Sequence, residues 1–182
     1  MGLKEKLQTD LTQAIRSRDE VQSGTIRMLL AAITNEEVAG KSAKVLNDAE
    51  VHGAGIITGS GYEVVITLGT GLGFAIFYGG KLTPHFEFSH ATVRRGTTYD
   101  TWIGEPERKR LGNVFWSRRI RQLVEELRPV FKWDRLYIGG GNARCIRPMD
   151  LERMGDDVVI VPNTAGVAGG VRAWNLEHYY RA

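Results

Sequence analysis

A glycine-rich segment is the part of this sequence whose residue types point most directly to chemistry. Thr67-Leu68-Gly69-Thr70-Gly71-Leu72-Gly73 stands between two runs rich in β-branched and aromatic residues. Glycines let backbone N–H groups approach an anion closely, and threonines add hydroxyl donors. No Gly-Lys-Ser/Thr follows, as a Walker A loop requires, and Phe74 occupies the third glycine position of a dinucleotide-binding fingerprint. The segment is therefore either a phosphate-binding loop, with candidate residues Thr67, Gly69, Thr70 and Gly71, or a structural hairpin turn.

Two polar pairs lie on either side of that loop in the sequence. Asn47-Asp48 precedes the small-residue segment 49–55, so either residue can cap the N-terminus of a helix, or Asp48 can act as a general base. Glu87 and His90 are three positions apart and can together hydrogen-bond vicinal hydroxyl groups, or form an ordinary surface pair. In the functional interpretation, the first pair supplies a general base and the second pair binds vicinal hydroxyl groups. In the structural interpretation, the first pair caps a helix and the second is an ordinary surface pair.

A second glycine cluster and a set of basic residues also allow two interpretations each. Leu136-Tyr137-Ile138 runs as a strand into Gly139-Gly140-Gly141, where a nucleotide base can lie against bare backbone, or the chain can turn tightly. Basic residues between positions 94 and 121 form either a ridge for a polyanion or, more simply, a solvated helix face. They are Arg94, Arg95, Arg108, Lys109, Arg110, Arg118, Arg119 and Arg121. The histidines without a partner pattern, which we expect to be structural or exposed, are His52, His85 and His178.

The elements that must position these residues begin with a helical hairpin. Apolar residues recur at helical spacing from Leu3 to about Val38, and polar residues with a glycine interrupt the pattern between Ser17 and Gly24. Gly40 is a suitable stop for the second helix. The two apolar stripes are Leu3, Leu7, Leu11 and Ile15, followed by Ile26, Leu29, Leu30 and Ile33.

After Gly40 the pattern changes to alternating strands and helices. Strand-like runs and helical segments follow one another, which favours an α/β domain. The expected strands are Tyr62–Thr67, Phe74–Tyr78, Leu136–Ile138 and Val158–Val161, and the expected helices are Asn113–Phe131 and Thr164–Leu176. In the longer helix we place Val114, Ile120, Leu123, Val124 and Leu127 on the inner side and Arg118, Arg119, Arg121 and Glu125 outside.

Composition narrows the class of protein. The 182 residues are 42% hydrophobic and 25% charged, which are ordinary globular values, and a net charge of +3 is too small to indicate nucleic acid. Cys145 is the only cysteine, so an internal disulfide and a cysteine-based zinc cluster are excluded, and we expect a cytosolic protein. No apolar run approaches the roughly 18 residues that span a membrane, so we expect no membrane partner.

Taken in order, these segments resemble the ROK family, which includes bacterial glucokinases, other sugar kinases and sugar-responsive repressors. Val45-Leu46-Asn47-Asp48-Ala49 is similar to the family's Asn-Asp-Ala segment, whose aspartate is the catalytic base. The segment Ile66 to Gly73 is similar to its second phosphate motif. Glu87-Phe88-Ser89-His90 matches its Glu-Leu-Gly-His sugar segment at Glu87 and His90. Leu136 to Gly141 and Asn163-Thr164-Ala165-Gly166 follow at the expected places.

Two departures from the family pattern stand out. Many members carry a cysteine-rich zinc motif after the sugar segment, and residues 97–110 contain no cysteine, so we expect no zinc. Polyphosphate glucokinases also lack that motif, and Tyr99-Asp100-Thr101-Trp102-Ile103-Gly104 resembles their sequence. The family opens with an Asp-x-Gly-Gly-Thr phosphate motif in a first lobe, and no Asp-x-Gly-x-Thr occurs in this sequence.

The N-terminal helices resemble a different family. Leu3 to Glu37, especially 26–33 and Asn35-Glu36-Glu37, is similar to the start of YqeY-like proteins, which are related to the tail region of the amidotransferase subunit GatB. We therefore predict a chimera with a YqeY-like hairpin in residues 1–43 and a ROK-like region in residues 44–182. The junction lies between about Gly40 and Val51, because Leu46 to Val51 suits both families.

The ROK resemblance implies an actin-like (ribonuclease H-like) ATPase lobe of α/β class and a glucokinase-like reaction. It makes Asp48 the base and assigns sugar hydroxyls to Asn47, Glu87 and His90. The donor, ATP or polyphosphate with Mg²⁺, would be held by the loop 67–71 and the turn 139–141. Without the first lobe we expect weak or absent activity; a homo-oligomer is left open. The alternatives are a non-catalytic scaffold in which the hairpin covers an apolar sheet surface, and a tRNA-linked YqeY-like binding protein.

Overall fold

The structure is a computed structural model that describes residues 3–17, 19–38, 46–85, 87–173 and 176. The chain forms two compact units, Met1–Val45 and Leu46–Ala182. Each unit is described by itself. Gly40 and His178 lie outside the described residues.

The first unit is the expected helical hairpin. Helix α1 spans Leu3–Arg16 and α2 spans Glu20–Val38, so the break is shorter than predicted and Gly24 lies inside α2. Ala14 and Ile26 are buried, whereas Ile15 and Leu29, both expected on the apolar stripes, are half exposed.

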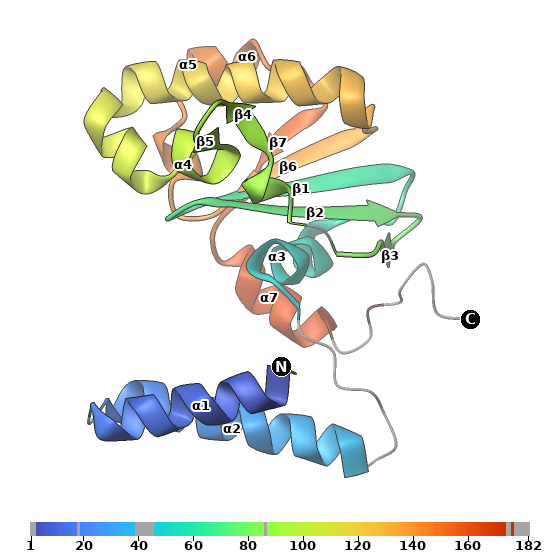
Figure 1. Ribbon diagram of the computed structural model, residues 1–182. Helices are drawn as coiled ribbons and strands as arrows, with labels where there is room; N and C mark the ends of the chain where they lie inside the picture. The colour runs from blue at the N-terminus through green and yellow to red at the C-terminus, as the bar shows by residue number, and fades with distance from the viewer. Residues whose placement is uncertain (1–2, 18, 39–45, 86, 174–175, 177–182) are drawn as a thin grey trace. The chain divides into compact units, whose positions relative to one another are not determined.

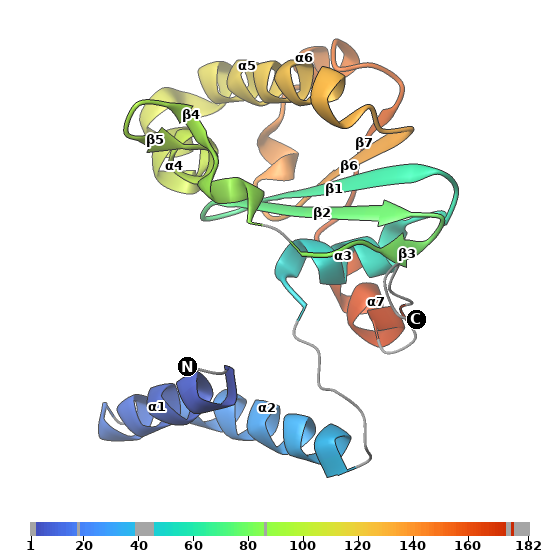
Figure 2. The ribbon, with the colours of Figure 1, turned by 45° about the vertical axis from the view of Figure 1, so that its right-hand side comes forward.

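The second unit is built on a five-stranded sheet of order β3-β2-β1-β6-β7 (Figures 1 and 2). The strands are β1 (Tyr62–Leu68), β2 (Leu72–Tyr78), β3 (Lys81–Leu82), β6 (Arg135–Gly139) and β7 (Val158–Ile160). Strands β1, β2 and β3 form an antiparallel meander, and β6 and β7 run parallel to β1. The expected α/β class is therefore confirmed.

Helices cover both faces of this sheet (Figure 1). Helix α5 (Glu105–Phe131) lies along one face with α4 (Tyr99–Ile103) and α6 (Pro148–Glu152) on the same side, and α3 (Asp48–Ile56) and α7 (Ala165–Arg172) cover the other. Successive residues of a strand point to opposite faces of the sheet, so alternate residues pack against the helices on one face and on the other. Ile66 and Leu68 pack in a core with Trp116 and Ile120, whereas Val65, Phe77 and Tyr137 pack against Ala49.

Close approach of α3 and α7 depends on a glycine. A Cβ atom placed on Gly169 would lie 1.7 Å from the carbonyl oxygen of Val51, so no larger residue fits without moving the backbone. This contact fixes the direction of α3, whose first turn carries Asp48.

Helix α5 departs from the prediction near its start. Gly112 has non-helical angles (φ 72°, ψ 158°), so the helix is two segments joined by a kink, and the expected start at Asn113 coincides with the second segment. Val114, predicted to face inward, is exposed, and Trp116 is fully buried instead, with its indole N–H donating to the carbonyl of Ile103 at 2.7 Å. The kink sets the rotation of the second segment, which periodicity alone did not reveal.

Shorter elements connect the layers. A small two-stranded sheet, β4 (Thr92–Arg94) with β5 (Thr97–Thr98), follows the 3-10 helix η1 (Phe88–His90), and a second 3-10 helix, η2 (Ala143–Cys145), follows β6. None of the helices in the described part of the chain is both long and apolar enough to cross a bilayer.

Most of the basic residues considered as a polyanion ridge pair with acids of the same unit. The pairs are Arg108 and Lys109 with Glu105, Arg110 and Arg119 with Glu107, and Arg121 with Glu125. Paired cations have less capacity to bind a polyanion, so this arrangement favours the simpler interpretation of a charged, solvated helix face.

Candidate functional site

The two glycine-rich segments lie side by side at the carboxyl ends of neighbouring parallel strands. Thr67 of β1 pairs with Gly139 of β6, and the N–H of Asn142 donates to the carbonyl of Leu68 at 2.9 Å. The Asn142 side-chain amide donates to the Gly69 carbonyl at 2.9 Å. Parallel strands thus bring the proposed phosphate loop, residues 67–71, against the proposed nucleotide turn, residues 139–141.

Gly140 is required for this approach. Its φ of +84° suits glycine, and a Cβ atom there would lie 2.5 Å from the carbonyl oxygen of Leu68. On its other side the turn lines a pocket of about 430 Å³ at the ends of β6 and β7. The pocket is lined by Gly140, Gly141, Ala143, Arg144, Ile160, Val161, Pro162 and Asn163.

The loop 67–71 is held by a hydrogen bond within the loop and by one to α4. The Gly69 N–H donates to the Gly71 carbonyl at 3.1 Å, and the Leu72 N–H donates to Asp100 Oδ1 at 2.9 Å. Gly69 therefore uses its N–H inside the loop. Thr67 is buried with its hydroxyl against Gly73, whereas Thr70 is exposed, so Thr70 is the loop threonine that a ligand can reach.

The first turn of α3 starts at the same edge of the sheet. Asn47 is its N-cap: Asn47 Oδ1 accepts the N–H of Glu50 at 2.7 Å, and Glu50 Oε2 accepts the N–H of Asn47 at 2.8 Å. Asn47 is therefore the helix cap, as one interpretation of the sequence predicted, and the side chain of Asp48 takes no part in the capping box. Ala49 packs against Gly73, where an added Cβ would lie 3.3 Å from the alanine Cβ, which brings the helix start beside the loop. Asp48 is 74% exposed there.

A buried histidine connects Asp48 to the end of β6. The Nδ1 atom of His52 lies 3.5 Å from Asp48 Oδ1, and neither ring nitrogen has a hydrogen-bond partner among the described residues. The ring packs against Gly139 and Gly166: Cβ atoms placed on these glycines would lie 3.3 Å from Cδ2 and 2.9 Å from Cε1, respectively. His52 therefore touches three of the segments that the sequence singled out.

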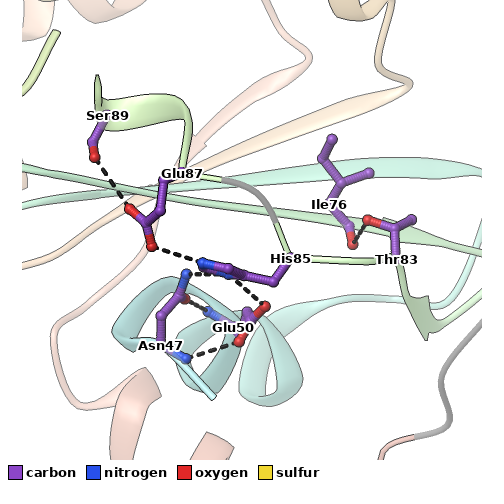
Figure 3. A network of polar contacts seen from close by, with 7 residues as sticks. All are labelled: Asn47, Glu50, Ile76, Thr83, His85, Glu87 and Ser89. Carbon is purple, nitrogen blue, oxygen red and sulfur yellow. Dashed lines mark hydrogen bonds and ion pairs between the residues drawn. The ribbon is translucent and has the colours of Figure 1, made fainter. Parts of the chain in front are cut away.

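Two of the three predicted sugar residues, Asn47 and Glu87, meet through a second histidine, His85, shown in Figure 3. His85 Nε2 lies 2.7 Å from Glu87 Oε1, and His85 Nδ1 lies 3.1 Å from Glu50 Oε1 and 3.2 Å from Asn47 Nδ2. The Ser89 hydroxyl donates to Glu87 Oε2 at 3.3 Å. Asn47 and Glu87, forty residues apart, thus join one network.

The remaining sugar candidate, His90, ends the 3-10 helix η1 and is exposed, with its backbone N–H donating to the Glu87 carbonyl at 3.3 Å. The sequence had left His85 without a partner and had assigned nothing to Glu50. Both belong to the network because α3 and the segment after β3 are brought together by the fold, and no local spacing signals such a pair.

Comparisons with known proteins relate the chain to two kinds of protein. The family described as Yqey-like protein matches residues 4–57. The polyphosphate glucokinase of Mycobacterium leprae (strain TN) is 26% identical over 171 residues, which cover 87% of this chain and 52% of that protein. The chain therefore spans about half the length of this curated relative. The YqeY match runs through α3, which belongs to the second unit, and the two matches overlap, because 87% of the chain cannot be covered without entering residues 4–57.

Solved structures show the same relationship. The inorganic polyphosphate/ATP-glucomannokinase from Arthrobacter sp. strain KM matches with a TM-score of 0.61 at 27% identity, covering 82% of this chain and 62% of that one. A ROK family glucokinase from Streptomyces griseus, in complex with glucose and AMPPNP, shares the fold with a TM-score of 0.50 at 18% identity, over 74% of this chain and 68% of that one. The chain thus joins a YqeY-like helical segment to a region that is similar to polyphosphate glucokinases and has the actin-like α/β fold of ROK sugar kinases.

Proposed function

We propose that the second unit carries the site of a sugar kinase, which transfers a phosphoryl group from ATP or polyphosphate to the 6-hydroxyl of glucose. The observation that supports this most is the meeting of three segments at one edge of the sheet: the start of α3, the loop 67–71 and the turn 139–141. The relatives named above are kinases of glucose or mannose, by their names, that use polyphosphate or ATP.

In this proposal Asp48 is the general base. Its carboxylate accepts the proton of the sugar hydroxyl while the hydroxyl oxygen attacks the terminal phosphorus of the donor, and the remaining phosphate leaves. Asp48 is well placed for this role because it is mostly exposed at the edge where the loop lies. Asn47, Glu87 and His90 hold the sugar hydroxyls, since an amide, a carboxylate and an imidazole together offer donors and acceptors.

The donor is held by the loop and the neighbouring turn. Thr70 offers an exposed hydroxyl, and the N–H groups of Thr70 and Gly71 have no backbone acceptor within the described residues. The 430 Å³ pocket beside Gly140 and Gly141 is the proposed place for the nucleotide base. A flat group can lie there because glycine presents no side chain.

Magnesium suits this donor set. When bound to the phosphates, Mg²⁺ neutralises charge that develops during transfer. In proteins Mg²⁺ uses one or two carboxylates together with phosphate oxygens and water. Among the described residues, no group of three or more His, Cys, Asp or Glu side chains is arranged so that it could hold a metal ion, and Asp100, one carboxylate at this edge, already accepts from Leu72. The residues present therefore fit an ion that is held mainly by the donor phosphates and water, which leaves Asp48 to act as the base.

We further propose that this chain alone turns over slowly. Phosphoryl transfer depends on positioning and electrostatic stabilisation, and the sequence contains no Asp-x-Gly-x-Thr motif to hold the phosphates from the other side. Loss of one such group raises the barrier by about 3 to 4 kcal/mol in other enzymes. A rate well below that of an intact kinase is the expected result.

The test is glucose-dependent consumption of each donor in turn. The full chain is incubated with Mg²⁺ and either ATP or polyphosphate, with and without glucose, and glucose 6-phosphate is measured directly. Product formed with at least one donor supports the proposal. A folded protein that forms no product with either donor over many hours contradicts it.

A further inference from the structure

His85 stands between two carboxylates, one on each side of its ring (Figure 3). Nε2 lies 2.7 Å from Glu87 Oε1 and Nδ1 lies 3.1 Å from Glu50 Oε1. The Glu50 side chain is only 3% exposed, whereas those of His85 and Glu87 are 40% and 57% exposed. The bridge therefore runs from a buried carboxylate to one that solvent and substrate can reach.

Counting donors decides between the protonation states of this ring. A neutral imidazole has one N–H donor and one lone pair, whereas an imidazolium has two N–H donors. Both nitrogens face carboxylate oxygens at hydrogen-bond distance, and an ionised carboxylate only accepts. In either neutral tautomer one carboxylate oxygen would face a nitrogen lone pair. With both carboxylates ionised, only the imidazolium donates to both; a ring unprotonated at Nδ1 would instead accept from the Asn47 amide at 3.2 Å and leave Glu50 Oε1 facing a lone pair.

Glu50 has little freedom to turn away from this contact. Its second oxygen, Oε2, accepts the backbone N–H of Asn47 at 2.8 Å as part of the capping box of α3. Rotating the carboxylate away from His85 would break that cap and leave a buried acceptor without a partner, which is costly. The charged groups in direct contact with the ring are thus Glu50 from α3 and Glu87 from its own segment.

We infer that His85 is held as an imidazolium that bridges Glu50 and Glu87, and that this bridge positions Glu87 and releases the Asn47 amide for a sugar hydroxyl. The positioning role rests on the proposed function, but the bridge does not. Asn47 Nδ2 lies 3.2 Å from His85 Nδ1. With Nδ1 protonated, the amide cannot donate to it and is free for an oxygen of the substrate. With Nδ1 unprotonated, the ring would occupy that amide hydrogen.

Nitrogen NMR of the imidazole rings tests the bridge without any activity. The full chain is labelled with ¹⁵N on histidine, and His85→Gln identifies the His85 signals at pH 7. We expect both ring nitrogens of His85 at the shifts of protonated nitrogens. One protonated and one unprotonated nitrogen in the wild-type spectrum would overturn the inference.

Two variants sharpen this measurement. Glu50→Gln keeps an acceptor for the capping box but replaces the oxygen facing Nδ1 by an amide that can donate, so we expect one His85 nitrogen to lose its proton at the same pH. Thr83→Val is the matched control on the same segment, because the Thr83 hydroxyl donates to the Ile76 carbonyl at 3.1 Å and does not touch the ring. It should leave the His85 signals unchanged. Unchanged His85 signals in Glu50→Gln would count against the bridge.

Kinetics test the positioning role separately. If glucose is phosphorylated, His85→Gln should raise the KM for glucose by about tenfold while kcat changes less, whereas Thr83→Val changes neither. An unchanged KM in His85→Gln refutes positioning even where NMR supports the bridge. Absence of turnover in the wild type refutes the proposed function and the positioning role together, and the NMR result still decides the bridge.

Discussion

At the residue scale, Asn47 caps a helix and is also proposed to bind a sugar hydroxyl. Its Oδ1 atom caps α3 by accepting the N–H of Glu50, while its Nδ2 atom points to His85 (Figure 3). The two atoms belong to one amide, so the same side chain starts the helix and faces the network. A capping interpretation and a binding interpretation of Asn47 are therefore compatible.

The two roles of Asn47 can be separated by substitution. Asn47→Ser keeps an N-cap acceptor and removes the amide donor, so the free energy of unfolding should change by less than about 0.5 kcal/mol, whereas Asn47→Ala should lower it by about 1 kcal/mol. Both should weaken glucose binding, measured as KM. Full glucose affinity in a stable Asn47→Ser variant would show that Asn47 is a cap alone.

His52 is buried, and its ring nitrogens have no hydrogen-bond partner among the described residues, although Nδ1 lies 3.5 Å from Asp48 Oδ1. Replacing a buried group that lacks partners by an apolar one is close to neutral or stabilising. We therefore expect His52→Leu to keep or raise the free energy of unfolding in urea, and to reduce kcat because Asp48 loses the neighbour at 3.5 Å. A loss of more than about 2 kcal/mol would mean that water or another group pairs with the ring.

Several of these placements follow from the sequence and others do not. The loop 67–71 and the turn 139–141 were singled out as glycine-rich segments after β-rich runs, and they meet because their strands are parallel neighbours. The partnership of Glu50 with His85 joins residues thirty-five positions apart in different elements. Periodicity carries no information about such a contact.

At the element scale, the kink in α5 is bridged by an ion pair between Glu107 and Arg119. Glu107, before Gly112, accepts from Arg110 Nη2 at 2.6 Å and from Arg119 Nη1 at 2.8 Å, and Arg119 lies after the kink. The hydrogen bonds from Arg110 and then Arg119 lower the pKa of Glu107 from 4.5 to about 2. The sequence predicted the second segment correctly, but one glycine conformation decided that Trp116 and not Val114 faces inward.

This cluster predicts acid sensitivity with a definite sign. Because the pKa of Glu107 is lower in the folded state, its stabilisation is fully present above about pH 4.5 and is lost as the pH falls towards 2. Glu107→Gln should cost about 1 to 2 kcal/mol at pH 7, allowing for screening of the exposed Arg110, and less than about half of that at pH 3. Urea unfolding at the two pH values measures this.

Glu125→Gln is the matched control on the same helix. Glu125 is 52% exposed and accepts from Arg121 at 3.0 Å, an ordinary surface pair. Its substitution should change stability by less than about 0.5 kcal/mol at either pH. Equal effects of Glu107→Gln at pH 7 and pH 3 would contradict the assignment.

At the scale of the whole molecule, the sheet of the second unit is covered on both faces by helices of the same unit. Helices lie on both faces of the sheet, and its edge strands, β3 and β7, have two and three residues, which limits edge pairing. The scaffold alternative assumed an apolar sheet surface for the hairpin to cover, and this arrangement removes much of its motive. The relationship to polyphosphate glucokinases, by contrast, extends over most of the unit.

The proposed role of Asp48 as the base of a sugar kinase can be tested by a single substitution. Glucose 6-phosphate formation is followed for the full chain, for Asp48→Asn, and for Asp156→Asn, an exposed aspartate outside the site. We predict measurable wild-type product, a loss of about 100-fold or more in Asp48→Asn, and no change in Asp156→Asn. Equal rates in wild type and Asp48→Asn, or no product from the folded wild type, would contradict the account.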